Sequence, residues 1–403
     1  MELFWLEHKK LWRKKIVKIC VLLCFVYCVI FGSILSFQWF CFGSSDDYTS
    51  AFGNNFDGYT VIKDSQEYAL SFGGELTDET LQKIVSDYQQ MEADGMEEEL
   101  EKTDWQIVNS WLGTLYPELR DTSNYKTMIS YVDPDKLTGF YERRQQVLDE
   151  FLEVSGQVGA EKEFLHQIER KVEKPFHYEW VEGWSTLLGS MVADLGVVMA
   201  LFLGIVLSSL FAGEWHDNTS TLVLTTRNGW GKIALAKILT GLAFTVELFA
   251  LLAVSSVISQ LFFMGTAGWN MPIQNIKLIA VAPMNMLQAE IYEYAFVLLG
   301  AIGFAGIVMF ISAAVKNNVL TLLLSLAVVY GPMMIAEYLP YEMQKALDLI
   351  PLVGSSTDIF RTNTFRILGK LIWSPYLLIT IPVLIGILCM PFAIKSWSRR
   401  MKA

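Results

Sequence analysis

Six long apolar stretches constrain this chain more than any other feature of its sequence. A membrane core about 30 Å thick is crossed by a helix of roughly 20 apolar residues, and each stretch approaches or exceeds that length. The first contains no charged residue, and the fifth is the shortest. They are Ile19 to Phe42, Trp184 to Ala212, Ala236 to Met264, Glu293 to Val315, Val319 to Ile335 and Ile372 to Ile394. We therefore predict an all-α polytopic membrane protein with six transmembrane helices.

Charge is distributed unevenly along this membrane protein. Residues 44–183 hold 30 acidic and 12 basic residues, whereas the remainder of the chain holds 12 acidic and 19 basic ones. One acidic soluble domain therefore interrupts a basic membrane protein. The first apolar stretch is longer than the apolar part of a signal peptide, which spans about 7–15 residues, so we expect it to remain as a membrane anchor.

The Lys and Arg residues that flank the spans predict the orientation, because cytoplasmic flanks carry an excess of them. With the N-terminus inside, fourteen basic residues lie in the cytoplasm and five in the short outer loops. The cytoplasmic set is Lys9, Lys10, Arg13, Lys14, Lys15, Lys18, Arg227, Lys232, Lys237, Lys316, Lys395, Arg399, Arg400 and Lys402. This orientation makes both termini cytoplasmic and the acidic domain extracellular.

The predicted segments follow from these spans. The cytoplasmic parts are an interfacial helix (1–15), a loop (213–235), a turn (316–318) and a tail (395–403). The six transmembrane helices are 16–42, 184–212, 236–264, 289–315, 319–337 and 372–394. The outer parts are the extracellular domain (43–183), a loop (265–288) and a re-entrant or amphipathic segment (338–371).

The extracellular domain shows the punctuation of helices. Thr77 is a predicted N-cap, and Leu81, Ile84 and Val85 follow it at helical spacing. Asp133 and Pro134 predict the start of another helix. A third apolar pattern runs through Phe164, Leu165, Ile168 and Val172 and stops at Pro175. We therefore expect a mostly helical domain.

The predicted cytoplasmic loop with its flanks, FAGEWHDNTSTLVLTTRNGWGKIALAK (211–237), is the most informative stretch. Glu214 ends an apolar span, a Thr/Leu-rich piece follows, and Arg227, Lys232 and Lys237 close the stretch. A solvated connector is one interpretation. The other is a surface that contacts a second protein.

This loop resembles the coupling segment of the permeases of type-2 ATP-binding cassette (ABC) exporters. The matching positions are Phe211, Gly213, Glu214, Thr219, Leu222, Leu224, Thr226, Arg227, Lys232 and Lys237. Asn218 stands where the family often has glycine, and Asn228-Gly229 replaces a turn that often contains proline. Six spans with an interfacial N-terminal helix are similar to the same family, and 140–152 and 175–188 look like its bacterial subgroup with a large first extracellular domain.

The resemblance implies an exporter in which two permeases, identical or related, form the pathway and separate ATPase subunits act on the coupling loops. ATP and Mg are then expected on the partner ATPase, and neither a cofactor nor a metal on this chain. The sequence has no G-x-x-x-x-G-K-[ST] motif: around Gly231-Lys232, Thr226 occupies the position of the first glycine and Ile233 that of the Ser or Thr. We therefore expect a transport permease that is not itself an enzyme and does not bind nucleic acid.

Two acidic residues lie within predicted spans, where an unpaired charge is costly. Asp194 and Glu247 either line a transport path or are buried carboxyl groups bonded to neighbouring hydroxyls. Glu290 and Glu293 are expected near the outer membrane surface. The acids at 194 and 247 also leave open an ion-coupled secondary transporter, and the extracellular domain leaves open a membrane sensor or adaptor.

Overall fold

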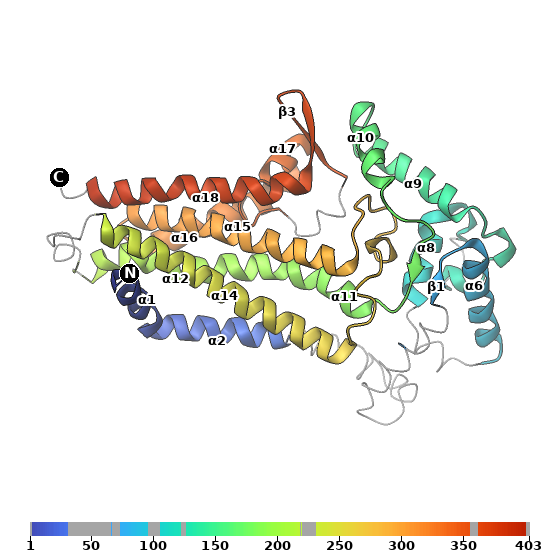
Figure 1. The fold of residues 1–403 in the computed structure, drawn as a ribbon, viewed down its shortest axis with the longest axis horizontal. Helices are drawn as coiled ribbons and strands as arrows, with labels where there is room; N and C mark the ends of the chain where they lie inside the picture. Colours follow the sequence, from blue (N-terminus) through green and yellow to red (C-terminus); the bar gives the residue numbers. More distant parts are fainter. Residues whose placement is uncertain are drawn as a thin grey trace.

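The computed structural model shows a long helical bundle with a smaller helical domain at one end (Figure 1). It describes residues 2–30, 66, 73–95, 105–121, 126–217, 219, 231–354 and 362–399. Five of the described helices are long and apolar enough to cross a membrane. They are α12 (Val192–His216), α14 (Lys232–Met264), α15 (Met286–Ala314), α16 (Asn318–Ile335) and α18 (Ser374–Arg399).

These five helices coincide with the second to sixth predicted spans and are those of a multi-pass membrane protein. The first predicted span begins within α2 (Lys15–Val29), whose inner face is formed by Val17, Cys20, Cys24 and Cys28. The remainder of that span, 31–42, lies outside the described residues. Before it comes α1 (Glu2–Arg13), which lies beside the start of α14 (Figure 1).

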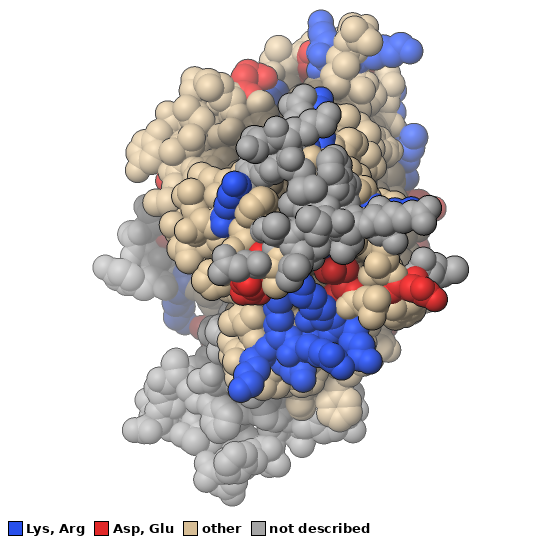
Figure 2. Space-filling model, turned by 90° about the vertical axis from the view of Figure 1, so that its left-hand side faces the viewer, with Lys and Arg blue, Asp and Glu red and all other residues tan. Residues whose placement is uncertain are grey.

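The bundle has two chemically different ends. One carries α1, the C-terminal ends of α12, α15 and α18, and the start of α14; we call it the basic end. Figure 2 looks onto this end and shows Lys and Arg side chains gathered in one patch with acidic side chains beside it. The opposite end carries the soluble domain, and we call it the domain end.

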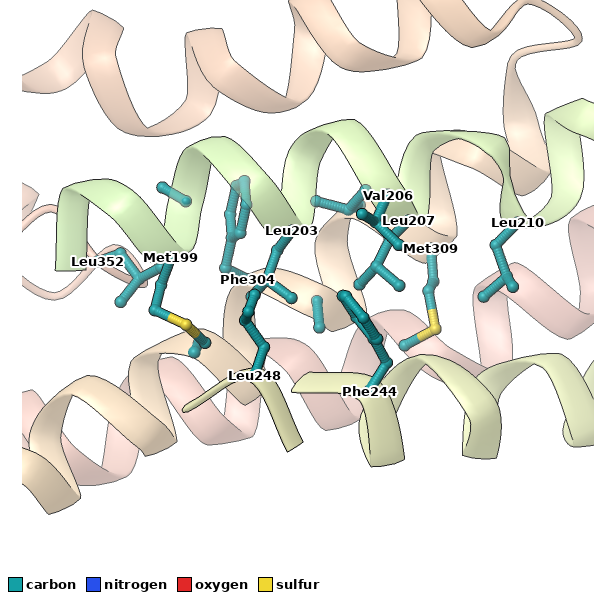
Figure 3. Close-up of a cluster of buried hydrophobic side chains, with 14 of the residues drawn as sticks. Met199, Leu203, Val206, Leu207, Leu210, Phe244, Leu248, Phe304, Met309 and Leu352 are labelled. Carbon is teal, nitrogen blue, oxygen red and sulfur yellow. The ribbon is translucent and has the colours of Figure 1, made fainter. Parts of the chain in front are cut away.

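The bundle core is formed by leucine, methionine and phenylalanine side chains (Figure 3). Met199, Leu203 and Leu207 of α12 lie among Leu248 of α14 and Phe304 of α15, and all five are at most 2% exposed. Because lipid is as apolar as these side chains, close packing of helices is the main source of their association.

Glycines allow α15 and α18 to pack closely. A Cβ atom added to Gly303 would lie 2.3 Å from the backbone oxygen of Pro382, and one added to Gly306 would lie 2.5 Å from that of Gly386. Small residues at such positions let helix backbones approach each other in membranes. The small residues of the fourth span therefore pack within this single chain.

Among its described residues, the soluble domain contains four helices, α6 (Asp78–Ala93), α8 (Trp105–Leu115), α9 (Phe140–Val154) and α10 (Ala160–Glu169). Between them lie the 3₁₀ turns η2 (Pro117–Leu119), η3 (Met128–Ser130) and η4 (Pro134–Lys136). A two-stranded antiparallel pair, β1 (Gly74–Glu75) with β2 (His177–Tyr178), closes the domain. The helix Glu182–Thr186 (α11) and the π-helix Leu187–Met191 (η5) lead from the domain into α12.

The structure confirms one predicted helix start and corrects another. Thr77 caps α6, since its hydroxyl accepts a hydrogen bond from the Thr80 backbone at 3.2 Å. The prediction that a single helix starts at Asp133-Pro134 is wrong, because Pro134 opens only η4. Gly139 (φ +72°) has a left-handed backbone conformation, which is incompatible with a continuous α-helix, and α9 starts at Phe140.

The domain is fixed to the bundle through the connection between α14 and α15, which includes the 3₁₀ turn η6 (Ile273–Asn275). Arg144 is fully buried, and its guanidinium donates to the backbone oxygens of Leu278 at 2.7 Å and Ala280 at 3.1 Å. It also pairs with Glu169 at 2.6 Å. One cation therefore joins two domain helices to this connection.

The segment between α16 and α18, which was expected to be re-entrant or amphipathic, contains both helix and strand. A 3₁₀ turn, η7 (Ala336–Tyr338), is followed by the short helix α17 (Tyr341–Leu347). The strands β3 (Thr364–Ile367) and β4 (Lys370–Trp373) then form an antiparallel pair directly before α18. The chain is thus mostly helical, with two small strand pairs among the described residues.

Candidate functional site at the basic end of the bundle

Glu214 is the centre of a buried ion-pair network at the basic end. It lies two residues before the end of α12, and its side chain is 3% exposed. One carboxylate oxygen, Oε1, accepts hydrogen bonds from Lys10 Nζ at 2.6 Å and from Lys237 Nζ at 2.8 Å. The other, Oε2, accepts from the Thr219 hydroxyl. Glu214 therefore joins α1, α12 and α14 and also contacts the connection that follows α12.

Lys237 extends this network. Its side chain is 2% exposed, and Nζ also donates to Glu7 Oε2 of α1 at 2.8 Å. Two carboxylates and two ammonium groups thus alternate in the order Lys10, Glu214, Lys237, Glu7. Buried charges are tolerated only when they are paired in this way, because removal from water costs several kcal/mol per ion. We call these four residues with Thr219 the Glu214 network.

A second lysine of the N-terminal region contacts α12 beside the network. Lys14 Nζ donates to the Ser209 hydroxyl at 2.9 Å. Burial and the charges of Lys237 and Lys10 lower the pKa of Lys14. Burial also acts to lower the pKa of Lys10, but its hydrogen bond to Glu214 and the charge of Glu214 outweigh this effect and raise the pKa. The network therefore favours a protonated Lys10.

The end of α12 is also bound to α15 and α18. The Ser312 hydroxyl of α15 donates to the Ser208 carbonyl at 2.6 Å and accepts from the Phe211 amide at 3.1 Å. The Phe211 ring packs against the fully buried Trp397 of α18, with ring centroids 5.5 Å apart. A displacement at the end of α12 would thus act directly on four other helices, α1, α14, α15 and α18.

Glu247, predicted as a pathway or buried polar residue, fixes α1 to α14. Its Oε2 accepts a hydrogen bond from Trp12 Nε1 at 3.0 Å, and its Oε1 lies 3.2 Å from His8 Nε2. The side chain is 42% exposed. Its contacts are therefore with α1, whereas the hydroxyl of the neighbouring Thr245 bonds to its own helix at Gly241.

The other predicted site residues are distributed as follows. Thr219 and Lys237 lie in the Glu214 network, whereas Lys232 is exposed at the start of α14. Leu222, Leu224 and Arg227 lie outside the described residues, as does the side chain of Asp194. The sequence reasoning did not single out Glu7 or recognise Lys10 as a partner of Glu214. The spacing of Glu7 and Lys10 was a signal for their common role, because residues at positions i and i+3 lie on the same face of a helix.

The chemistry of this site is electrostatic and mechanical. Among the residues that the structure describes, no group of three His, Cys, Asp or Glu side chains lies together so that it could hold a metal ion. The arrangement provides a buried junction between helices under a basic surface. Comparison with known proteins adds no constraint, since no protein-family profile, no curated protein sequence and no solved structure matches the chain.

Proposed function

We propose that this chain is the permease subunit of an ABC exporter in a bacterial cell membrane. It moves a peptide, an antibiotic or a lipid-like compound outwards, and a separate ATPase subunit binds ATP and Mg and drives the movement. In this proposal the chain has six transmembrane helices, both termini are cytoplasmic, and a second permease, the same or related, completes the pathway. The soluble domain is then extracellular.

The observation that carries the proposal is the position of the Glu214 network. α12 ends and α14 begins at the basic end, and Glu214 lies two residues before the end of α12. An ATPase that pushes on the connection between α12 and α14 would act on α12 and, through Lys10 and Lys237, on α1 and α14. A buried ion pair is either formed or broken, and such a contact suits a junction between helices that must switch between two conformations.

The excess of basic residues at this end supports the same orientation. α1 and the start of α2 supply Lys9, Lys10, Arg13, Lys15 and Lys18, all exposed. The acidic domain lies at the other end (Figure 1). Cytoplasmic membrane flanks carry such an excess of Lys and Arg, so the basic end is assigned to the cytoplasm, where ATP is present.

A charge reversal at Glu214 tests the proposal. The assay compares the ATPase rate of the partner subunit with and without the membrane chain in lipid vesicles. We expect Glu214→Lys to abolish the increase that the membrane chain causes. Glu2→Lys is the matched control, because Glu2 is an exposed acid of α1 outside the network, and it should keep the increase.

Protein that is present in the vesicles but misfolded would also lack the increase. Lys10→Met covers this case, since Lys10 is half exposed and its loss leaves Lys237 on Glu214. We expect this milder variant to insert normally and to lose part of the increase. Full ATPase stimulation by both Glu214→Lys and Lys10→Met would refute the proposed coupling role.

A further inference from the structure

A second group of polar side chains lies inside the bundle, on the facing surfaces of α14 and α15 near the domain end. Ser256 and Gln260 of α14 are 0% and 1% exposed, and Glu290 of α15 is 3% exposed. Glu290, which was expected near the outer membrane surface, is covered by the protein itself. Ionisable groups buried within a membrane bundle are expensive and commonly functional.

A hydrogen bond between α14 and α15 shows that these polar side chains lie at the same depth in the bundle. The Ser256 hydroxyl lies 2.8 Å from the Tyr294 hydroxyl of α15. The two helices run in opposite directions, so one turn from Ser256 towards the domain end leads to Gln260, and one turn from Tyr294 in the same direction leads to Glu290. Residues four apart share a helix face, which sets Gln260 and Glu290 on facing surfaces. We call Ser256, Gln260, Glu290 and Tyr294 the polar seam.

The polar seam has buried polar atoms without hydrogen-bond partners. Neither side-chain atom of Gln260 has a partner with hydrogen-bond geometry, and the Glu290 carboxyl group interacts with the Tyr294 hydroxyl but with no cation of α14 or α15. The cationic residues of α14, Lys232 and Lys237, lie at its basic end, and α15 has none. A buried polar group without a partner costs about 1–3 kcal/mol, and a charged one costs more.

We infer that the polar seam binds the protonated amine of a compound that the protein transports. An ammonium group has three donors, which match the Glu290 carboxylate, the Gln260 carbonyl and a hydroxyl of Ser256 or Tyr294. A divalent metal fits less well, since the described residues hold no group of three metal-binding side chains. The inference rests on the proposed function, because it names the substrate class as cationic amines. The groups are covered in this structure, so binding requires α14 and α15 to separate locally.

Three related probes test the inference on the full chain in lipid nanodiscs. Phenethylamine carries charge and N–H donors, its N,N,N-trimethyl analogue carries only the charge, and phenethyl alcohol carries no charge. Binding is measured by isothermal titration. We expect phenethylamine to bind about tenfold more tightly than the trimethyl analogue, which cannot donate hydrogen bonds, and the alcohol to bind least. Equal binding of all three would refute the inference.

Protein variants assign the site. Glu290→Gln preserves the shape of the side chain and removes its charge, and we expect it to weaken phenethylamine binding at least about tenfold. Gln260→Met should weaken it about fivefold. Glu247→Gln is the matched control, because the Glu247 carboxylate of α14 contacts α1 outside the polar seam, and this variant should bind phenethylamine as the unmodified chain does.

The outcomes separate this inference from the proposed function. No binding of phenethylamine by the unmodified chain at millimolar concentration overturns the amine site, as does unchanged binding by both Glu290→Gln and Gln260→Met. If Glu290→Gln does not fold, Gln260→Met and the probe series still decide. None of these measurements needs the ATPase, so an amine site can be found even if no ATPase associates with the chain.

Discussion

The most specific structural prediction concerns the charge on Glu214. Glu214→Gln keeps the size of the side chain and one oxygen acceptor but removes the negative charge between two ammonium groups. Breaking a buried ion pair from one side costs about 3–5 kcal/mol of stability. Lys237 keeps its 2.8 Å pair with Glu7, and Lys10 is half exposed and can be solvated. We therefore expect a smaller loss, about 2–3 kcal/mol in the free energy of unfolding.

Chemical denaturation of the purified chain in detergent measures this loss. The matched control is Glu163→Gln, which breaks an ion pair with Arg170 whose side chains are 54% and 68% exposed. Exposed pairs contribute about 0–1 kcal/mol, so the control should change little. The double variant with Lys237→Met isolates the coupling between Glu214 and Lys237. A loss for Glu214→Gln that equals the control loss would refute the buried network.

Four further predictions test other parts of the structure. Arg144→Met should destabilise the domain junction by about 3–5 kcal/mol, seen as faster hydrogen exchange in 273–285. Burial acts to raise the pKa of Glu169, but hydrogen bonds from Lys174 and Arg144 outweigh this effect and lower the pKa. The ionised Glu169 therefore stabilises the fold fully above its ordinary pKa, and this stabilisation disappears as the pH falls through the lowered pKa of the folded state. Amide protection factors, which correct for the intrinsic pH dependence of exchange, would contradict this if they were equal at pH 3 and pH 7.

Gly306→Ala should abolish stable folding, because the added methyl group would clash with α18. The control is Gly331→Ala, whose methyl group would meet nothing within 4 Å and should leave the stability unchanged or raise it by up to about 1 kcal/mol in thermal unfolding. Equal effects of the two substitutions would contradict the close packing of α15 and α18. Trp12→Phe removes the indole N–H that donates to Glu247 and fixes α1 to α14. We expect tryptic cleavage within α1 to become about fivefold faster. An unchanged cleavage rate would show that the hydrogen bond between Trp12 and Glu247 does not hold α1 in place.

The second to sixth apolar helices were predictable because hydropathy over about 20 residues directly reflects membrane solvation. Local rules also predicted the Thr77 cap. They failed at Asp133-Pro134, where Pro134 begins a 3₁₀ turn and the backbone of Gly139 prevents the helix from continuing. A glycine in sequence does not reveal whether its φ will be positive.

The candidate site was predictable only in part. The position of Glu214 at the end of a span and that of Lys237 near the start of the next could be read from sequence. Their common contact with Lys10 and Glu7 could not, because more than 200 positions separate α1 from these residues and only tertiary packing brings them together. The contacts of Glu247 were unpredictable for the same reason, because the sequence of an apolar helix does not indicate which other helix will donate a hydrogen bond to its carboxylate.

The most direct test of the exporter proposal is purification of the tagged chain from its native membrane in mild detergent, with quantitative mass spectrometry of its partners and an ATPase assay of the preparation. We predict a P-loop ATPase at equal stoichiometry and ATP hydrolysis that depends on Glu214. A chain that emerges alone, without ATP hydrolysis even when the products of neighbouring genes are supplied, would contradict the proposal.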